Sequence, residues 1–368
     1  MSRVKNTNTP GQRVAPDLAR RPVRTLSALA KHIGVSPTTV SFVLNGKAAE
    51  RKISVETVER VLAAARDVNY TPNALARGLR QKRTHAIGVV FPHLRNDWAH
   101  RIMQGVAEQL GQTETVPMIV CHHGDAELEA RLLRSLVERR VDGILCNPLR
   151  GGMDRYRDVV RRGVPLVFLG DAPKGLDEIS CSSWDPAAIE LAVRHLIELG
   201  HRRIAYVGNR DNRVISEARR QTFWDLLKQA DLPRSRQNII LSPTSETVDD
   251  RPLRLLQSPD APTAFFAEYD DLAVSLHSTF ASHGIDAPKD ISIVTMGGQP
   301  RSIGPGMTLT TVTAPVIEEG RAAAKCLMAL IDDPEHTPIR QTVEGGKLHR
   351  GWSTGPVSER SDKKLVIS

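Results

Sequence analysis

Apolar residues between positions 25 and 70 recur at the three- and four-residue spacing that is typical of amphipathic helices. The first stripe consists of Leu26, Leu29, Ala30 and Ile33. Gly34 interrupts it, and Ser36 and Pro37 predict a new helix, because serine caps a helix N-terminus and proline suits the first helical position. Val40, Val43 and Leu44 form the second stripe. Asn45-Gly46 is a pair that can end this second helix.

A third helix is predicted to begin after Ser54, which is a suitable N-cap. We expect its inward face to comprise Val55, Val58, Val61, Leu62 and Ala65. Tyr70-Thr71-Pro72 ends the pattern, because proline disfavours helical backbone in the residue before it. The segment therefore predicts three short helices.

From Ala86 onward, short apolar runs alternate with amphipathic segments. Strands are predicted at 86–91, 116–121, 141–146, 164–169, 203–207, 237–241, 262–267 and 291–296. Helices are predicted at about 98–111, 125–140, 152–162, 186–199, 214–230, 270–283 and 316–331. This alternation is typical of parallel sheets covered by helices. More than 200 residues of it are better divided into two subdomains than placed in one sheet.

The charge of the 368-residue chain is concentrated in its first quarter. Residues 1–84 hold 16 Lys and Arg against 5 Asp and Glu, which leaves 34 against 37 for residues 85–368. The net charge of +8 therefore comes from the N-terminal part alone. A basic segment joined to a near-neutral body indicates a nucleic-acid-binding head, since Lys and Arg neutralise phosphates. Residues 1–24 by themselves lack the apolar periodicity of a core, and we expect them to be disordered.

Composition also indicates the cellular compartment and the redox state of the cysteines. The longest apolar stretches fall far short of the roughly 18 residues that span a bilayer, and the basic N-terminus lacks the apolar core of a signal peptide. We expect a cytoplasmic protein with no membrane partner. Cysteines 121, 146, 181 and 326 stand far apart with no CxxC pair, so we expect reduced core thiols and neither a zinc module nor a disulfide framework.

The stretch from Thr25 to Gly46 has the order of a helix–turn–helix, in which a second helix projects its polar N-terminal side toward a major groove. On composition alone a generic helical hairpin is an equal alternative. This stretch, Ser54–Tyr70 and the run Pro72-Asn73-Ala74-Leu75-Ala76-Arg77-Gly78-Leu79-Arg80 together resemble the LacI-type bacterial repressor family. The resemblance covers about Thr25 to Thr354. It continues through Ile87–Pro92, Arg139–Ile144, His195–Tyr206 and Leu309–Val312.

The resemblance implies an α/β protein with an all-α head and a body like a periplasmic sugar-binding protein, with two doubly wound lobes around a ligand cleft. It implies a homodimeric repressor of a catabolic or transport operon that binds palindromic double-stranded operator DNA and a small-molecule effector, with no cofactor. A regulator that depends on a corepressor is the alternative. The expected segments are a basic extension (1–24), the helix–turn–helix domain (25–71), the hinge helix and linker (72–84), the effector domain (85–356) and a flexible tail (357–368). Because the tail contains no leucine heptads, a dimer is favoured over a tetramer.

The family's base-reading sites correspond here to Pro37, Thr38 and Phe42. Its phosphate and groove contacts correspond to Ser36, Thr39, Ser41 and Asn45, and Asn73 belongs to the hinge. Threonine can hydrogen-bond a base edge, and phenylalanine can contact a thymine methyl group. Pro37 has neither donor nor acceptor in its side chain, so it can serve as a helix starter instead.

Residues 72–80 match the family's hinge helix. A helix of about nine residues is too short to be stable alone in water, so we expect it to order only on DNA. Leu79 matches the family's wedge, which enters the minor groove and bends the duplex. The alternative for Leu79 is a core contact, which the flanking Arg77 and Arg80 disfavour.

Enzyme classes receive little support from the sequence. No GxGxxG, Walker, HExxH or GxSxG pattern occurs. Cys121-His122-His123 offers metal-ligand types, but adjacent residues on a strand point to opposite faces, which argues against a joint metal site. We therefore expect no catalytic residues and no metal. An enzyme with a DNA-binding head and a periplasmic binding protein remain as weaker alternatives.

The effector is the least determined part of the resemblance. Arg219 matches the family's effector-binding arginine and Asp270 the aspartate of its Asn-Asp pair, where Tyr269 replaces the asparagine. Met296-Gly297-Gly298 stands where the family usually has an aromatic residue and two aspartates. An acceptor commonly used for sugar hydroxyls is therefore missing at Gly297.

Other candidate effector residues lie in segments that border the cleft in relatives. The bases are Arg95, His122, His123 and Arg213, with Trp98 to cover an apolar face and Asp185 and Asp270 as the acids. Fewer acids and more bases favour an anion, because arginine pairs with carboxylate or phosphate. We expect a sugar acid or a sugar phosphate, with a neutral sugar as the alternative. Apart from Arg219, any of these arginines can equally be a surface residue.

Overall fold

The computed structural model describes residues 25–70 and 83–357, except 177–178, 185–186, 211–212, 245, 298, 334–336, 338 and 345. The side chains of 180–184 and 187 are not described. The expected N-terminal extension, the hinge with Asn73 and Leu79, Asp185 and the tail from 358 lie outside the described residues. The chain divides between Thr84 and His85 into two compact units, here called the head and the body.

The head consists of the three predicted helices, α1 (Leu26–Ile33), α2 (Pro37–Leu44) and α3 (Val55–Asp67). Serine and threonine hydroxyls cap all three N-termini, because the side chains of Thr25, Ser36 and Ser54 each accept a backbone N–H three residues on. Gly34 adopts φ 70° and closes α1, as the predicted interruption requires. The helices enclose a small apolar core of Leu29, Ala30, Val40, Val43, Val61 and Ala65.

The predicted inward face of α3 was partly wrong. Val55 is 74% exposed and Leu62 is 41% exposed. Val58, Val61 and Ala65 lie one turn apart and cover the core together. Leu62 follows Val61 directly and is rotated by about 100° around the helix, which turns it away from the core. Val55 is the first residue of the helix.

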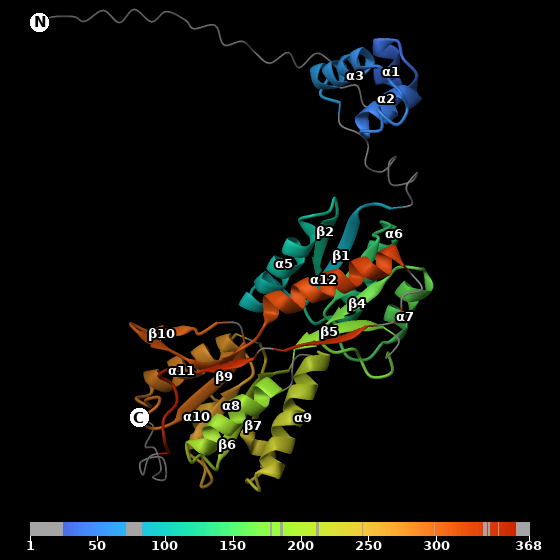
Figure 1. Cartoon of the computed structure of the whole chain (residues 1–368). Helices are drawn as coiled ribbons and strands as arrows, with labels where there is room; N and C mark the ends of the chain where they lie inside the picture. Colours follow the sequence, from blue (N-terminus) through green and yellow to red (C-terminus); the bar gives the residue numbers. More distant parts are fainter. Residues whose placement is uncertain are drawn as a thin grey trace, which may run out of the picture. The chain divides into compact units, whose positions relative to one another are not determined.

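The body has two lobes, each built on one six-stranded sheet (Figure 1). The N lobe has strand order β13-β5-β4-β3-β1-β2, and all its strand pairs are parallel. Its strands are β1 (Ala86–Phe91), β2 (Val116–Cys121), β3 (Gly143–Cys146), β4 (Leu166–Leu169), β5 (Ser180–Trp184) and β13 (Arg340–Val343). One face carries α5 (Asp97–Leu110) and α12 (Val316–Asp332), and the other carries α6 (Ala126–Glu138) and α7 (Asp154–Arg161).

The C lobe has strand order β14-β12-β9-β8-β6-β7. Its strands are β6 (Ile204–Asn209), β7 (Ile239–Ser242), β8 (Ala264–Ala267), β9 (Ser292–Gly297), β12 (Thr310–Thr313) and β14 (Lys347–His349). The helices are α8 (Ala187–Glu198), α9 (Val214–Gln229), α10 (Arg251–Leu256) and α11 (Asp270–Ser282). A 3-10 turn, η1 (Arg236–Asn238), and a small hairpin of β10 (Ser302–Gly304) and β11 (Met307–Thr308) complete it.

The apolar pattern located the central strands and missed the polar ones. All eight predicted strands are present, with ends that differ by up to two residues, and so are the seven predicted helices. The pattern did not predict α10, nor the strands β5, β10, β11, β12, β13 and β14, whose sequences are rich in polar residues. The strand β14 is also antiparallel to β12, against the expectation of purely parallel sheets.

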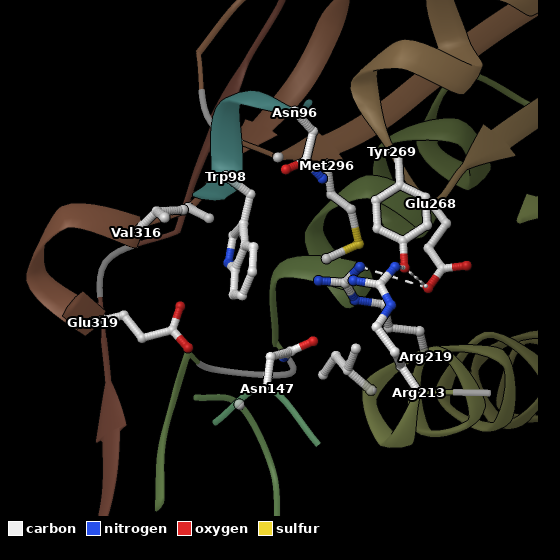
Figure 2. A pocket seen from close by; sticks show the side chains of 14 residues that line it. Asn96, Trp98, Asn147, Arg213, Arg219, Glu268, Tyr269, Met296, Val316 and Glu319 are labelled. Atoms are coloured by element: carbon white, nitrogen blue, oxygen red, sulfur yellow. Dashed lines mark hydrogen bonds and ion pairs between the residues drawn. The ribbon is translucent and has the colours of Figure 1, made fainter. Parts of the chain in front are cut away.

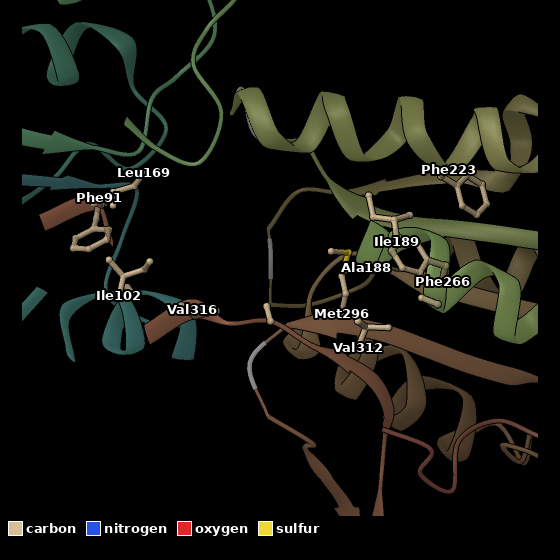
Figure 3. Close-up of a cluster of buried hydrophobic side chains, with 14 of the residues drawn as sticks. Phe91, Ile102, Leu169, Ala188, Ile189, Phe223, Phe266, Met296, Val312 and Val316 are labelled. Atoms are coloured by element: carbon tan, nitrogen blue, oxygen red, sulfur yellow. The ribbon is translucent and has the colours of Figure 1, made fainter. Parts of the chain in front are cut away.

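The chain passes between the lobes after β5, after β12 and after β13, so neither lobe is a continuous segment. One cluster of buried apolar side chains extends through this boundary (Figure 3). It includes Phe91, Ile102 and Leu169 of the N lobe and Phe266 and Val312 of the C lobe. Apolar side chains of both lobes therefore pack into one core beside the segments that connect the lobes.

Helix α12 returns the chain to the N lobe and packs against α5 at close range (Figure 1). Gly105 of α5 meets the carbonyl oxygen of Ile317, and Gly320 of α12 meets the carbonyl oxygen of Ile102. A Cβ at either glycine would overlap the facing backbone. This glycine contact sets the position of the first turn of α12, which borders the site described below.

We predict that Gly105→Ala lowers the free energy of unfolding of the body by about 1–3 kcal/mol or more, as overpacking does. Gly111 is the matched control at the end of the same helix, where the backbone is αR and a Cβ would lie 3.2 Å from the Ala107 carbonyl. Gly111→Ala is expected to change stability by less than about 1 kcal/mol. Urea unfolding of the full chain measures both. Equal transition midpoints for Gly105→Ala and wild type would contradict the glycine contact.

Candidate functional site

The N-terminal side of α2 presents exposed polar side chains. The Ser36 hydroxyl accepts the Thr39 N–H at 3.0 Å and lies 2.8 Å from the Thr39 hydroxyl. Pro37 and Thr38 are exposed, and Thr39 is half-buried. The structure thus leaves Thr38 accessible for a base edge and engages Ser36 and Thr39 in the cap.

Farther along α2, the predicted contact residues differ in exposure. Ser41 is 9% exposed, and the Asn45 amide donates to its carbonyl at 2.6 Å and to its hydroxyl at 3.2 Å. The Ser41 hydroxyl is thus engaged by Asn45 within α2, and the expectation that Ser41 contacts DNA stays a prediction. Phe42 is half-buried, with the guanidinium of Arg51 4.8 Å from its ring centroid. Asn45 is exposed, but its amide is directed back onto the helix.

A pocket lies between the two lobes of the body (Figure 2). Its N-lobe side is lined by Asn96, Trp98, Asn147, Gly170 and Glu319. Its C-lobe side and the connecting segment contribute Arg213, Ile215, Arg219, Glu268, Tyr269, Met296, Gly297, Ala314 and Val316. We call it the interlobe pocket. Of the predicted effector residues, the structure brings Trp98, Arg213, Arg219 and Tyr269 together here.

The C-lobe side of the pocket is organised around the Tyr269 hydroxyl (Figure 2). That hydroxyl donates to Glu268 Oε1 at 2.9 Å, accepts from Arg213 and lies 3.0 Å from Ser216 Oγ. The two guanidiniums lie over its ring, 5.1 Å and 5.4 Å from the centroid for Arg213 and Arg219. Glu268 is fully buried and pairs with Arg219 at 3.5 Å. Two cations and one carboxylate are thus held around one aromatic ring.

The N-lobe side of the pocket combines an aromatic face with buried acceptors. The Trp98 ring packs edge-on against Phe91, with centroids 5.7 Å apart. Glu319 is 1% exposed and accepts hydrogen bonds from the Trp98 side chain and the Gly170 backbone N–H. Burial raises the pKa of Glu319 to about 8, although Arg219 and these hydrogen bonds oppose the rise. At neutral pH this carboxyl is mostly protonated.

Four helices begin at the interlobe pocket. Asn96, Arg213 and Tyr269 are the N-cap residues of α5, α9 and α11, and Val316 is the first residue of α12. Helix N-termini carry partial positive charge and unpaired N–H groups, so they favour anions. The backbone therefore adds to the positive potential of the two arginines.

A buried polar cluster in the N lobe holds the loop that reaches across the lobe boundary. Glu129 is fully buried, accepts from the Tyr156 hydroxyl at 2.9 Å and pairs with Arg155 at 2.5 Å. The Leu149 N–H donates to Tyr156 Oη at 2.9 Å, and the Leu149 carbonyl accepts from Arg155 at 3.2 Å. Leu149 in turn forms an antiparallel bridge with Arg213. This cluster therefore positions the N-lobe edge of the pocket against a pocket arginine.

Two predicted basic residues do not act as pocket cations. His122 is fully buried, accepts the Gly124 N–H at Nδ1 and contacts the Asn147 carbonyl through Nε2 at 3.3 Å. Desolvation lowers the pKa of His122 to about 4, so it is neutral and supports Asn147 rather than a ligand. His123 is exposed in a turn with φ 52° and does not line the pocket.

Two further predicted residues lie outside the pocket lining. Arg95 has a 65% exposed side chain and pairs with Glu246 of the C lobe at 2.9 Å, so it ties the two lobes together. The Asp270 carboxylate occupies the space over Gly297, where a Cβ would collide with it. The glycine that departs from the family pattern thus makes room for Asp270. A second interlobe ion pair joins Arg150 and Glu217 at 3.1 Å.

Sequence reasoning missed the buried acceptors Glu268, Glu319 and Asn147. Glu268 directly precedes the Tyr269-Asp270 pair, so the end of β8 was a signal for it. Asn147 directly follows the apolar run of β3, a position at the carboxyl edge of a parallel sheet that often carries site residues. Glu319 had no such signal, because it lies inside a helix beside an equally acidic Glu318.

No group of three His, Cys, Asp or Glu side chains in the described part of the chain is placed to hold a metal ion. None of the described helices is long and apolar enough to cross a membrane. Cys146 and Cys326 are buried thiols and Cys121 is a partly buried one, and none of the three forms a disulfide.

Comparison with known families matches the head and the body separately. Residues 25–73 match bacterial regulatory proteins of the lacI family, and residues 193–354 match the periplasmic binding protein-like domain. Among solved structures, the lac repressor dimer bound to operator and the anti-inducer ONPF covers 91% of this chain and 100% of its own, with a TM-score of 0.77 and 23% identity. A LacI family regulator from Enterococcus faecium with bound ribose covers 74% of this chain and 100% of its own, with a TM-score of 0.62 and 26% identity.

Curated relatives align over nearly their full length. The HTH-type transcriptional repressor PurR of Aliivibrio salmonicida (strain LFI1238) is 30% identical over 322 residues, which cover 85% of this chain and 93% of that protein. The probable HTH-type transcriptional regulator EndR of Paenibacillus polymyxa is 27% identical over 321 residues, which cover 85% of this chain and 92% of that protein. These relatives are transcription regulators and not enzymes. Since the similarity extends over head and body alike, the chain belongs to the LacI family of DNA-binding transcriptional repressors with a ligand-binding domain.

Proposed function

We propose that this regulator represses a carbohydrate catabolism or transport operon, and that an acidic sugar in the interlobe pocket controls its affinity for operator DNA. The observation that carries the proposal is the pair of buried guanidiniums at the start of α9. Arg213 is 5% exposed and Arg219 is 8% exposed. Buried charges need compensation, and Arg219 pairs with the buried Glu268 carboxylate. A ligand carboxylate would add an anionic partner on the pocket side of these guanidiniums.

The charge of the pocket favours a sugar acid over a sugar phosphate. Its lining residues include two guanidiniums, the Glu268 carboxylate and Glu319, whose pKa is raised to about 8 by burial. A sugar acid adds one negative charge beside the two guanidiniums, whereas a phosphate monoester adds about −1.5 to −2. The four helix N-termini act in the same direction.

A neutral sugar is the second candidate. One structural relative carries ribose and another is a complex with cellobiose. The exposed side of Trp98 offers the apolar face on which a sugar ring can pack. In that case Arg213 and Arg219 would hydrogen-bond hydroxyl groups and would keep Tyr269 and Glu268 in place.

The second part of the proposal concerns how the head binds operator DNA. We infer that Thr38, Pro37 and Phe42 face the major groove of a palindromic operator, which two copies of the chain bind as a homodimer. An effector that binds one arrangement of the lobes more tightly shifts the population of operator-competent dimers by linkage. The sign of the response follows from operator titrations with and without the effector.

Thr38→Ala is predicted to weaken operator binding about tenfold, since one base contact contributes about 1–3 kcal/mol of discrimination. The head should keep its melting temperature, because Thr38 is exposed and alanine is a better helix former. Fluorescence anisotropy on a duplex recovered by genomic pull-down measures the loss. An unrelated duplex of equal length is the control. An equal loss on both duplexes would contradict base reading by Thr38.

Arg219→Ala is predicted to lower the affinity for sugar acids at least tenfold, because a buried charged hydrogen bond is lost. Arg220→Ala is the matched control, since Arg220 lines a separate outer groove with Trp224. Calorimetry with neutral sugars and their uronic, aldonic and phosphorylated forms measures both variants, and circular dichroism verifies their fold. Binding of a neutral sugar alone, with an affinity that Arg219→Ala leaves unchanged, would overturn the acidic effector.

A further inference from the structure

A second groove lies on the C lobe beside its edge strand β7 (Figure 1). Its lining comes from α9, from the turn after α9, from η1 and from β7. The lining residues are Arg220, Trp224, Leu232, Arg234, Arg236 and Ile239. None of them lines the interlobe pocket. We call this site the outer groove, and it is separate from the proposed effector site.

Three guanidiniums in the outer groove lack a counter-charge. Within the described part of the chain, the side chains of Arg220, Arg234 and Arg236 form no hydrogen bond or ion pair. None of the residues that line the groove is acidic. Elsewhere in the same lobe an exposed arginine does have a partner, since Arg254 of α10 pairs with Asp250. The groove therefore presents a concentration of positive charge that an anion can balance.

The turn after α9 places two of these arginines on either side of Ser235. The Ser235 hydroxyl accepts the N–H two residues on, at 3.2 Å, and begins η1. Arg234 and Arg236 are exposed, and Arg220 is half-buried. Asp231, the acid of this turn, is exposed with φ 52° and lies outside the groove lining. Accessible guanidiniums of this kind bind phosphate oxygens through paired hydrogen bonds.

An apolar surface accompanies the arginines in the outer groove. Leu232 is 8% exposed, and Trp224 and Ile239 are half-buried. The Trp224 ring contacts Phe223, with centroids 6.4 Å apart. No guanidinium of the described residues lies over the Trp224 ring. An aromatic side chain of this kind, next to basic residues, is a stacking platform for a nucleobase.

We propose that the outer groove binds a nucleoside diphosphate, with its base on the Trp224 indole and its phosphates on Arg220, Arg234 and Arg236. Such a ligand carries about −2.5 to −3 at neutral pH, because its terminal phosphate contributes about −1.5 to −2 and its inner one about −1. This charge matches the three guanidiniums. Pyrophosphate would leave the indole uncovered, and a nucleoside would leave the arginines unpaired. The inference goes beyond the proposed function and does not depend on the identity of the effector.

Helix α9 contributes to both sites through different residues. Arg219 lines the interlobe pocket and Arg220 lines the outer groove. Successive residues of a helix are rotated by about 100°, so the two arginines leave α9 in different directions. Substitutions in the outer groove can therefore be made without changing a residue of the pocket lining.

The test is titration calorimetry of the full chain with ADP and with GDP, at low salt and without Mg²⁺. We expect binding that quenches tryptophan fluorescence, since Trp224 is one of the four tryptophans of the chain. Adenosine, which has no charge, and pyrophosphate, which has no base, should each bind at least about tenfold more weakly than ADP. Added salt should weaken ADP binding, because charges on exposed side chains are screened.

Trp224→Leu should weaken ADP binding about tenfold and remove the quenching, because the stacking platform is lost. Arg234→Ala and Arg236→Ala should each weaken it about threefold to tenfold. Both arginines are exposed, so these two variants keep the test valid if Trp224→Leu does not fold. Arg139→Ala is the matched control, because Arg139 is an exposed arginine of the N lobe whose guanidinium also has no partner among the described residues. It should behave as wild type, and circular dichroism verifies the fold of every variant.

Several results would overturn the inference. Unchanged nucleotide affinity in Trp224→Leu and in both arginine variants would place the nucleotide outside the outer groove. Equal affinities for ADP and pyrophosphate would leave an anion site without base recognition. The absence of nucleotide binding at millimolar concentration also overturns it, and binding of a glutamate-rich peptide that Trp224→Leu abolishes would then assign the groove to an acidic protein segment. None of these results bears on the effector, because the groove and the interlobe pocket share no lining residue.

Discussion

The carboxyl ends of two sets of parallel strands face each other across the lobe boundary, and the pocket follows from this constraint. Asn147 and Gly170 directly follow β3 and β4, Asn96 caps the helix that follows β1, and Glu268 and Tyr269 directly follow β8. Because each central strand of such a sheet is followed by a helix, the helix N-termini gather at the same edges. The polar groups and the positive ends of the helices thus meet where the lobes meet.

The same boundary explains why the lobes can act together. The chain crosses it after β5, β12 and β13, and a continuous apolar core runs through it. Three contacts join the lobes around the pocket. Leu149 forms a β-bridge with Arg213, and Arg95 and Arg150 form ion pairs with glutamates of the C lobe. The ion pairs are exposed and weak individually. A ligand that binds residues of both lobes therefore adds a comparatively strong contact, which is what control by an effector requires.

The head depends on local interactions to a much greater extent. Its three helices begin at capping hydroxyls that are recognisable in the sequence, and Gly34 closes the first of them in a left-handed conformation. Even in the head, the sequence of a single helix did not determine which of its side chains point inward. Ser41 stands at a position that contacts DNA in the family, but it is buried and its hydroxyl accepts a hydrogen bond from the Asn45 amide. In α3, the packing of α1 and α2 decided that Val61 is buried and Leu62 exposed.

The sequence by itself determined the family, the helix–turn–helix, the alternation of strands and helices and the place of Arg219 in the pocket, because these depend on periodicity, caps and motif spacing along the chain. It did not determine the polar strands β5, β12 and β13, whose burial comes from neighbouring strands and not from their own apolar content. Only the tertiary structure decided which ionisable groups share the pocket. It turned Asp270 toward Gly297, made His122 a neutral support of Asn147 and brought Glu319 to face Arg219. The reason is physical: the charge state and the partners of a buried group depend on the dielectric and the donors around it, and here these come from residues 25 to 100 positions apart in the chain.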